Sequence, residues 1–349
     1  YYRLVRDLIM AVLGAAAGGG GGQLPTIAFF GSQTWTPSYD VTAKVFVIGA
    51  GGGGAAKFDW NGKCSGGGAG GCAVSELTFS SGTAYTITIG AGGAGEEAAT
   101  GNNWQSDGYG NGTAGGNSSL SGSGISTMTG NGGAGGIQVN SASDACLGGA
   151  GGSASGGTLG NFTGGAGGLL TGIGDHSASG GGAVGLWATG NAAPVGVTNG
   201  HVGKMGGCIS WDHDTFTAAY ALNAGHPTNS NTAAPPVPTM PPFADLSVYE
   251  KDYATHDSAT RYGATGTERK SGYLPNYRHI YMSSDSYQGG IAGPFCGGIG
   301  WGNVAAIARG GRGCLGGGGG GAAATNAVAC YGGAGGSGGV LIFPSSIGS

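Results

Sequence analysis

Charged side chains are scarce in this sequence. Asp, Glu, Lys and Arg make up 9% of the 349 residues, against about a quarter in an average soluble protein. Only 13 residues are Lys or Arg, they are spread over the whole chain, and the formal net charge is −4, so we expect no nucleic-acid partner. No run reaches the roughly 18 consecutive apolar residues of a membrane-spanning helix, so we expect no insertion into a membrane.

Proline and paired cysteine motifs are also scarce. The chain has 12 Pro, and its Gly residues come in clusters rather than at every third position, which excludes collagen. No two cysteines form a C-x-x-C pair, so a zinc site is not expected. Disulfides remain an alternative, but an odd number of cysteines cannot all pair within one chain, and we favour mostly free, buried thiols. The seven cysteines are Cys64, Cys72, Cys146, Cys208, Cys296, Cys314 and Cys330.

Glycine, in contrast, accounts for 86 residues. Such a bias indicates either a flexible linker or a backbone geometry that only glycine satisfies. Disordered chains are poor in aromatic and β-branched residues, whereas this chain is 39% hydrophobic and 9% aromatic. Because glycine loses more conformational entropy on folding than any other residue, a folded form requires dense hydrogen bonding and close packing.

Composition divides the chain into four regions. Residues 1–25 include the helix-compatible segment RLVRDLIMAVLGAAA, which we interpret as a short N-terminal helix or docking arm, although it also loosely resembles a signal peptide. Residues 26–208 form the first part of a glycine-rich domain and residues 290–349 form its second part. Between them, residues 209–289 hold only five Gly but eight of the 14 Tyr, which indicates an insertion subdomain that projects from a glycine-rich core.

Short strands are expected to frame that core, in a mainly β or irregular fold. Alternating or apolar patterns predict strands at 42–49, 84–89 and 339–343. The glycine clusters between them, such as Gly130–Gly136 and Gly148–Gly152, share no rigid sequence repeat and suit up-and-down passes through one core. Extended glycine helices with three residues per turn could pack there by hydrogen bonding to each other. Ala and Ser would lie at the periphery, and the run at 315–324 would lie deep in the stack.

Three framing segments resemble the glycine-rich domain of phage tail-fibre proteins and adhesins. They are QTWTPSYDVTAKVFVIGAGGGG, FSSGTAYTITIGAGGAG and GGAGGSGGVLIFP, which together cover roughly residues 26–95 and 315–345. The resemblance is to the distal tail-fibre adhesins of T-even-like phages, and it implies a sandwich of polyglycine-II helices whose tip loops touch a bacterial receptor. A similar glycine-rich fold in receptor tyrosine kinases of the anaplastic lymphoma kinase group fits less well, since no kinase segment is present.

Catalytic and cofactor motifs are weak. Patterns of the form G-x-G-x-x-G arise by chance in so glycine-rich a chain, and none is followed by the helix and acidic residue of a dinucleotide site. The run from Trp211 to Asp214 offers two carboxylates and an imidazole for a metal or for acid–base chemistry, but an exposed polar loop is the preferred interpretation. The pairs Asp175-His176 and His256-Asp257 are interpreted as surface residues. We therefore expect no catalytic, cofactor or metal site.

Aromatic residues of the insertion are the better candidates for recognition, because Tyr combines a large contact area with a polar group. About half of them could instead pack the subdomain or a contact between subunits. The proline-rich stretch at 233–243 should be stiff and extended. The candidate receptor-binding residues are Trp211, Tyr249, Tyr253, Tyr262, Tyr273, Tyr277, Tyr281 and Tyr287.

The resemblance implies an extracellular virion protein of the tail fibre or tail tip. It would bind a bacterial surface glycan or outer-membrane protein without chemistry, alongside other tail-fibre proteins and as a possible homo-oligomer such as a trimer. One alternative is a purely structural fibre, spike or filament subunit whose insertion mediates assembly. A weaker alternative is a surface-glycan depolymerase, which needs paired carboxylates; Asp252 and Asp257 are present, but no spacing argument supports them.

Overall fold

A computed structural model gives the architecture of the chain. It describes residues 27–58, 63–99, 109–139, 144–170, 308–324 and 329–347. The expected N-terminal helix and most of the insertion therefore lie outside the described residues. Shorter described pieces are 177–178, 181–182, 184, 189–190, 192–193, 269–271, 278–281, 287–288, 297–298 and 300–303.

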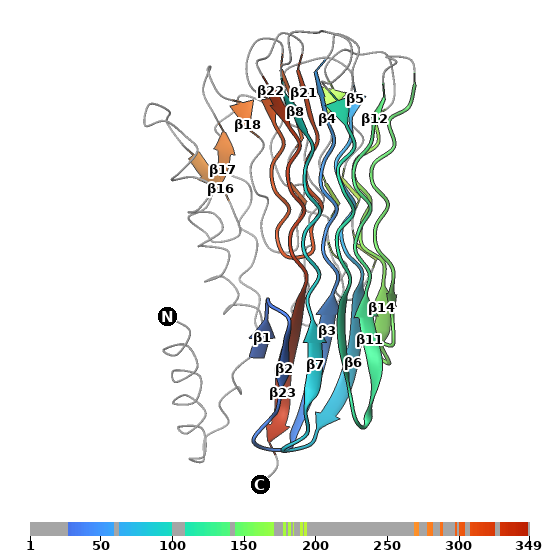
Figure 1. Cartoon of the computed structure of the whole chain (residues 1–349), viewed down its shortest axis with the longest axis vertical. Coiled ribbons are helices and arrows are strands. Elements are labelled where there is room, and N and C mark those ends of the chain that lie inside the picture. Colours follow the sequence, from blue (N-terminus) through green and yellow to red (C-terminus); the bar gives the residue numbers. More distant parts are fainter. Residues whose placement is uncertain are drawn as a thin grey trace.

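The described part of the chain is mainly β, as the sequence predicted. Its regular elements are all strands, and none of its segments is a helix long and apolar enough to cross a bilayer. Figure 1 shows three zones stacked along the long axis. Longer strands form one end, the glycine runs form the middle, and short strands form the opposite end.

Two five-stranded sheets make the first zone, which we call the sandwich. In the first sheet the order is β1 (Ile27–Phe29), β23 (Gly339–Ile347), β3 (Val41–Ile48), β6 (Cys72–Phe79) and β14 (Gly160–Phe162). In the second sheet the order is β13 (Ala154–Ser155), β11 (Ile125–Gly130), β10 (Ser118–Gly122), β7 (Tyr85–Thr88) and β2 (Gln33–Trp35). The strands predicted at 42–49, 84–89 and 339–343 are confirmed as β3, β7 and β23, within a residue at most bounds; β23 continues to Ile347.

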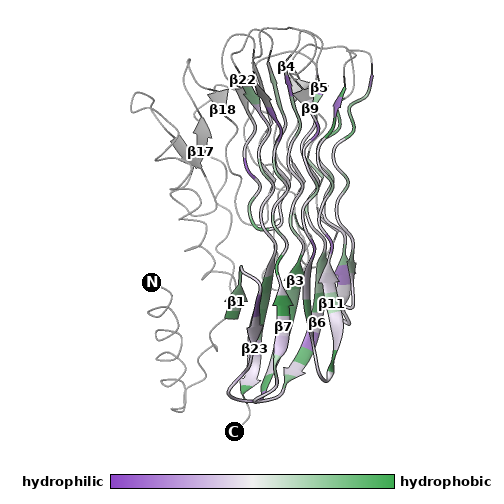
Figure 2. Cartoon of the chain, in the orientation of Figure 1, coloured by the Kyte–Doolittle hydropathy of each residue, from purple (hydrophilic) through white to green (hydrophobic). Residues whose placement is uncertain are grey.

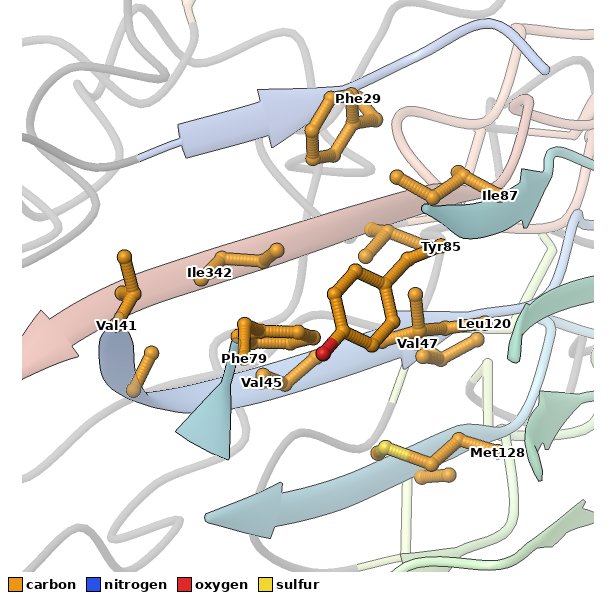
Figure 3. Close-up of a cluster of buried hydrophobic side chains, with 13 residues drawn as sticks. Phe29, Val41, Val45, Val47, Phe79, Tyr85, Ile87, Leu120, Met128 and Ile342 are labelled. Carbon is orange, nitrogen blue, oxygen red and sulfur yellow. The ribbon is translucent and has the colours of Figure 1, made fainter. Parts of the chain in front are cut away.

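The sandwich core lies between these two sheets. Alternate residues of β3, such as Val45 and Val47, pack against the second sheet, because successive strand side chains point to opposite faces. Aromatic rings pack at the end of this layer that is farther from the glycine runs. Phe79 and Tyr85 meet edge to face with ring centroids 4.9 Å apart, and the ring centroids of Trp35 and Phe79 are 5.0 Å apart. Figure 3 shows Val45, Phe79 and Tyr85 with the other buried side chains of this core, which point toward one another from strands of both sheets. Apolar burial therefore anchors the sandwich end, where Figure 2 shows the most hydrophobic strands.

Glycine runs continue directly from the sandwich strands into the middle zone. The run at residues 49–55 follows β3 and donates backbone hydrogen bonds to three different runs with a period of three residues. Gly49, Gly52 and Ala55 donate to run 65–71, Ala50 and Gly53 donate to run 113–116, and Gly51 and Gly54 donate to run 333–336, at 2.8 to 3.0 Å. Its carbonyls accept from three further runs, at 93–96, 133–136 and 319–322. One run thus bonds to six neighbours.

Two other runs are surrounded in the same way. Run 65–71 bonds to runs 49–55, 131–137, 149–152, 316–319, to Gly165 and to Gly182. Run 316–322 bonds to runs 49–55, 65–70 and 333–337 and to Gly182, Gly298 and Gly311. The three central runs therefore touch one another, and residues 316–323 of the run predicted to lie deep in the core are buried. Because every backbone group needs a partner when buried, this arrangement replaces the ladder of an ordinary sheet.

At many inward positions of these runs only glycine fits. A Cβ built on Gly52, Gly53 or Gly68 would overlap a carbonyl of a neighbouring run. Outward positions recur every third residue and carry small side chains: in run 148–153, Ala150 and Ser153 are exposed while Gly149 and Gly152 are buried. Ala and Ser therefore lie at the periphery of this outer run, as expected. In the central runs the expectation is wrong, because Ala50, Ala55, Ser65 and Ala69 are fully buried.

Short strands make the third zone, which we call the tip. Its first sheet has the order β12 (Gln138–Val139), β5 (Lys63–Cys64) and β15 (Ser177–Ala178). Its second has the order β18 (Tyr287–Gln288), β20 (Ala308–Arg309), β22 (Ala329–Tyr331) and β8 (Glu97–Ala99). Its third has the order β19 (Trp301–Asn303), β21 (Ala322–Ala324), β4 (Ala56–Phe58) and β9 (Tyr109–Gly110). A separate pair joins β16 (Arg269–Ser271) to β17 (Arg278–Tyr281).

Candidate functional site

The tip is positioned by the glycine runs beneath it. Run 49–55 carries the chain from β3 to β4, and run 65–71 returns it from β5 to β6. Runs 90–96, 111–117 and 131–137 likewise connect sandwich strands with β8, β9 and β12. Because each run is bonded to several others, the tip strands stand on a support that is held in all lateral directions (Figure 1).

Two buried lysines lie where the runs enter the tip. Lys57 and Lys63 are each 1% exposed. The Lys63 ammonium donates to the backbone carbonyl of Asp144 at 2.7 Å, and the Lys57 ammonium donates to the carbonyl of Val139 at 3.3 Å. Charge-assisted bonds of this kind are stronger than neutral ones. Lys57 therefore ties β4 to β12, and Lys63 ties β5 to the segment that follows β12, so both hold the base of the tip together.

Three cysteine thiols lie near these lysines. Burial raises the pKa of the Cys64 thiol well above its usual value, and Cys146 and Cys330 raise it further, while Lys57 opposes them. Burial also raises the pKa of Cys146 to about 11, against the opposing effects of Ser65 and Lys63. Burial thus favours the protonated thiol over the thiolate at Cys64 and Cys146.

The described cysteines are free, as the sequence predicted. Cys64, Cys72, Cys146, Cys314 and Cys330 are all buried and unbonded to another sulfur. The remaining two cysteines, Cys208 and Cys296, lie outside the described residues. Within the ranges that the structure describes, no group of three His, Cys, Asp or Glu side chains could hold a metal ion.

Most of the candidate receptor-binding residues lie outside the described part of the chain. This holds for Trp211, Tyr249, Tyr253, Tyr262, Tyr273 and Tyr277, and for the Asp-His motifs at 175–176, 212–214 and 256–257. Two candidates fall on described strands. Tyr281 ends β17 opposite Arg269 of β16, and Tyr287 begins β18 opposite Ala308 of β20.

The pairing of β18 brings the end of the insertion into a tip sheet. β18 runs parallel to β20, which pairs with β22, which in turn pairs with β8 of the first glycine-rich part. Tyr287 is therefore in the same sheet as residues almost 200 positions away in sequence. The sequence predicted an insertion that returns to the core. It did not predict the tip sheets or the burial of Lys57 and Lys63, because the tip strands are too short for a periodic pattern and a charged side chain is normally exposed.

Comparison with known proteins adds no relative: neither a protein-family model nor a curated protein matches the sequence.

Proposed function

We propose that this chain is a virion structural protein of a phage tail fibre or tail tip, which binds a receptor on the bacterial surface without catalysis. The observation that carries the proposal is the rigid glycine support that separates a hydrophobic sandwich from a tip of short strands. A recognition protein needs contact residues held in place by a stiff scaffold. The many connections at the tip give room for sequence change without disturbing the support.

The glycine runs are, in this proposal, polyglycine-II helices packed side by side. A polyproline-II-like helix has three residues per turn and no internal hydrogen bonds. Its backbone groups therefore point to neighbours with a period of three, which is the period of the bonds made by run 49–55. An ordinary β-strand has a period of two and bonds within one plane, so it does not explain bonds to six neighbouring runs.

The resemblance to tail-fibre adhesins supports the same proposal. The first framing segment contains β2, β3 and the central run 49–55. The second contains β7 and the run that follows it, and the third contains run 332–338 and β23. The segments therefore supply strands to both sandwich sheets, and their glycine runs bond directly to one another. The matched segments therefore belong to one structural unit, although they lie at opposite ends of the sequence.

The receptor-binding surface is proposed to include the aromatic residues of the insertion, 209–289. β18 joins the C-terminal end of the insertion to a tip sheet, at the end of the molecule farthest from the sandwich (Figure 1). Tyr side chains present a large surface with little loss of entropy, which suits a glycan or an outer-membrane protein.

Deletion of residues 215–285 tests the proposal. Adsorption of the purified protein to host bacteria should be abolished, while the urea midpoint of the glycine-rich body should change little. Tyr39→Ser is the matched control, since Tyr39 is a 49% exposed Tyr at the sandwich end, and it should leave adsorption intact. Unchanged adsorption by the deletion variant would overturn the proposed site. A deletion variant that binds cells but loses self-association would instead assign the insertion to assembly.

A further inference from the structure

The C-terminal part of the chain fills the centre of a fold built by the N-terminal part. We call residues 308–347 the closing segment and residues 27–170 the body. β23 of the closing segment lies between β1 and β3 of the body and pairs with both. Its register with β3 runs from Gly339 opposite Ile48 to Ile347 opposite Val41. Without β23, the described strands β1 and β3 would be separated by the width of one missing strand.

Side chains of β23 complete two apolar layers at once. Val340 and Ile342 pack in the sandwich core with Tyr85 and Leu120 of the body. Leu341 points to the other face of the same sheet and packs with Phe46. All three β23 side chains are fully buried. Burying such a side chain contributes about 1.5–3 kcal/mol. If β23 were absent, apolar side chains of the body would be exposed on both faces of the first sheet.

Backbone bonds hold the glycine runs of the closing segment to the body. Run 316–322 exchanges bonds with two body runs: Gly67 and Gly70 donate to it, and Gly319 and Ala322 donate to carbonyls of run 49–55. Run 332–338 accepts from Gly51 and Gly54 and donates to carbonyls of the run that follows β7. Leaving these groups unpaired in the interior would cost about 1–3 kcal/mol each.

The shape of the position selects its occupant. A Cβ on Gly318 would overlap the carbonyl of Gly67, and a Cβ on Gly335 would overlap the carbonyl of Gly51. The space that the closing segment occupies therefore admits a run of small residues with glycine at the crowded positions, followed directly by an apolar strand. The sequence of the closing segment, GGAGGSGGVLIF, has this pattern.

We propose that the body forms a binding slot for the closing segment, and that the segment stays bound when the covalent link between them is cut. The hydrogen bonds and apolar contacts given above join the body to residues 308–347 without the insertion. The insertion meets the closing segment separately, where β18 pairs with β20. This adds a strand to a sheet in the manner of β-augmentation, with glycine runs as a second specificity element. The insertion is then a removable tether, which can be cleaved or exchanged without releasing the closing segment.

The test uses the full chain with a site-specific protease sequence inserted after Thr232. After cleavage, both fragments should elute together from a size-exclusion column at the size of the uncut protein, and should separate only in denaturant. Refolding the separated mixture should restore that single species. If the folded protein resists the protease, cleavage is done in urea and the mixture is refolded. Fragments that elute separately without denaturant, or that fail to re-form while the uncut chain refolds, would overturn the proposal.

A matched pair of variants tests the role of the glycine positions. In the cleaved protein, Gly318→Val should reduce re-formation of the complex at least tenfold, because the new side chain overlaps Gly67. Ala334→Val adds the same branched side chain at a half-buried outward position of the closing segment, and re-formation should stay within about twofold of the parent. Equal effects of the two substitutions would show that the slot does not select for glycine.

Discussion

Replacing Gly52 by Ala tests the packing of the glycine runs at the level of one methyl group. Gly52 lies in the middle of the central run, where its amide donates to Gly68 and its carbonyl accepts from Gly319. A Cβ there would overlap the carbonyl of Ala134 on a third run. The backbone oxygen cannot rotate away as a side chain could, so run 131–136 must move outward.

The expected loss of stability is about 3 kcal/mol. Moving run 131–136 weakens its two bonds to the central run, from Gly133 to Ala50 and from Gly136 to Gly53, at about 1 kcal/mol each. Steric strain from overpacking adds about 2 kcal/mol. Ala lowers the entropy of the unfolded chain relative to Gly, which offsets about 1 kcal/mol of this.

Urea unfolding measures the effect, and two further Gly→Ala variants serve as controls. Gly31 is exposed, and an added Cβ there has nothing within 4 Å, so Gly31→Ala should change the free energy of unfolding by less than about 1 kcal/mol. Gly82 also has open space but has a φ of +71°, so Gly82→Ala should cost about 1–2 kcal/mol from backbone strain alone.

The order of the urea midpoints of the three variants tests whether the glycine runs are closely packed. We expect the urea midpoint to fall most for Gly52→Ala, less for Gly82→Ala and hardly at all for Gly31→Ala, with similar m-values. If Gly52→Ala were as stable as Gly31→Ala, the central runs would have to be loosely packed, and the account of glycine as the residue that permits close approach would be wrong.

Three further predictions concern the sandwich and the tip. Ser118→Ala should cost about 1–3 kcal/mol in urea unfolding, because the buried Ser118 hydroxyl accepts from the amide of Gly90 at 3.0 Å; Ser119→Ala, on a half-buried neighbour, should cost less. Phe79→Ala should cost about 3–5 kcal/mol, since Phe79 is fully buried between Trp35 and Tyr85; a loss below 1 kcal/mol would contradict its place in the core. The pKa of Cys146 is raised from 9.0 to about 11, so its contribution to stability is full below pH 9 and is lost as the pH rises toward 11. Stability measured over pH 8–11 should therefore fall less steeply for Cys146→Ala than for the parent.

The sequence predicted the strands of the sandwich well, because their side chains carry the pattern. Alternation in VTAKVFVI and YTIT and the apolar run VLIF indicate where β3, β7 and β23 lie. The composition also predicted that glycine packs a core, since a chain with this content of aromatic and hydrophobic residues is unlike a disordered one. The free state of the described cysteines followed from their use as small apolar residues.

The neighbours of each glycine run were decided only by the tertiary structure. A run such as GAGGGG has no side chains to specify a partner or a register, so nothing local in the sequence places run 49–55 beside runs 65–71 and 319–322. The strands at the ends of the runs supply that information: β3 pairs with β6 and β23 over eight-residue stretches, and the attached runs are aligned as a consequence.

The tip shows the same division between local and tertiary information. Its strands are two to four residues long, too short for a periodic pattern, and their pairing follows from where the runs deliver them. Lys57 and Lys63 would be expected on the surface from their charge, yet both are buried because their ammonium groups donate hydrogen bonds to backbone carbonyls of a distant segment. The sequence by itself determined where the main sandwich strands β3, β7 and β23 lie and that glycine packs a core, because side-chain pattern and size are local properties. The tertiary structure decided which runs meet and what the tip contains, because those depend on contacts between segments far apart in the chain.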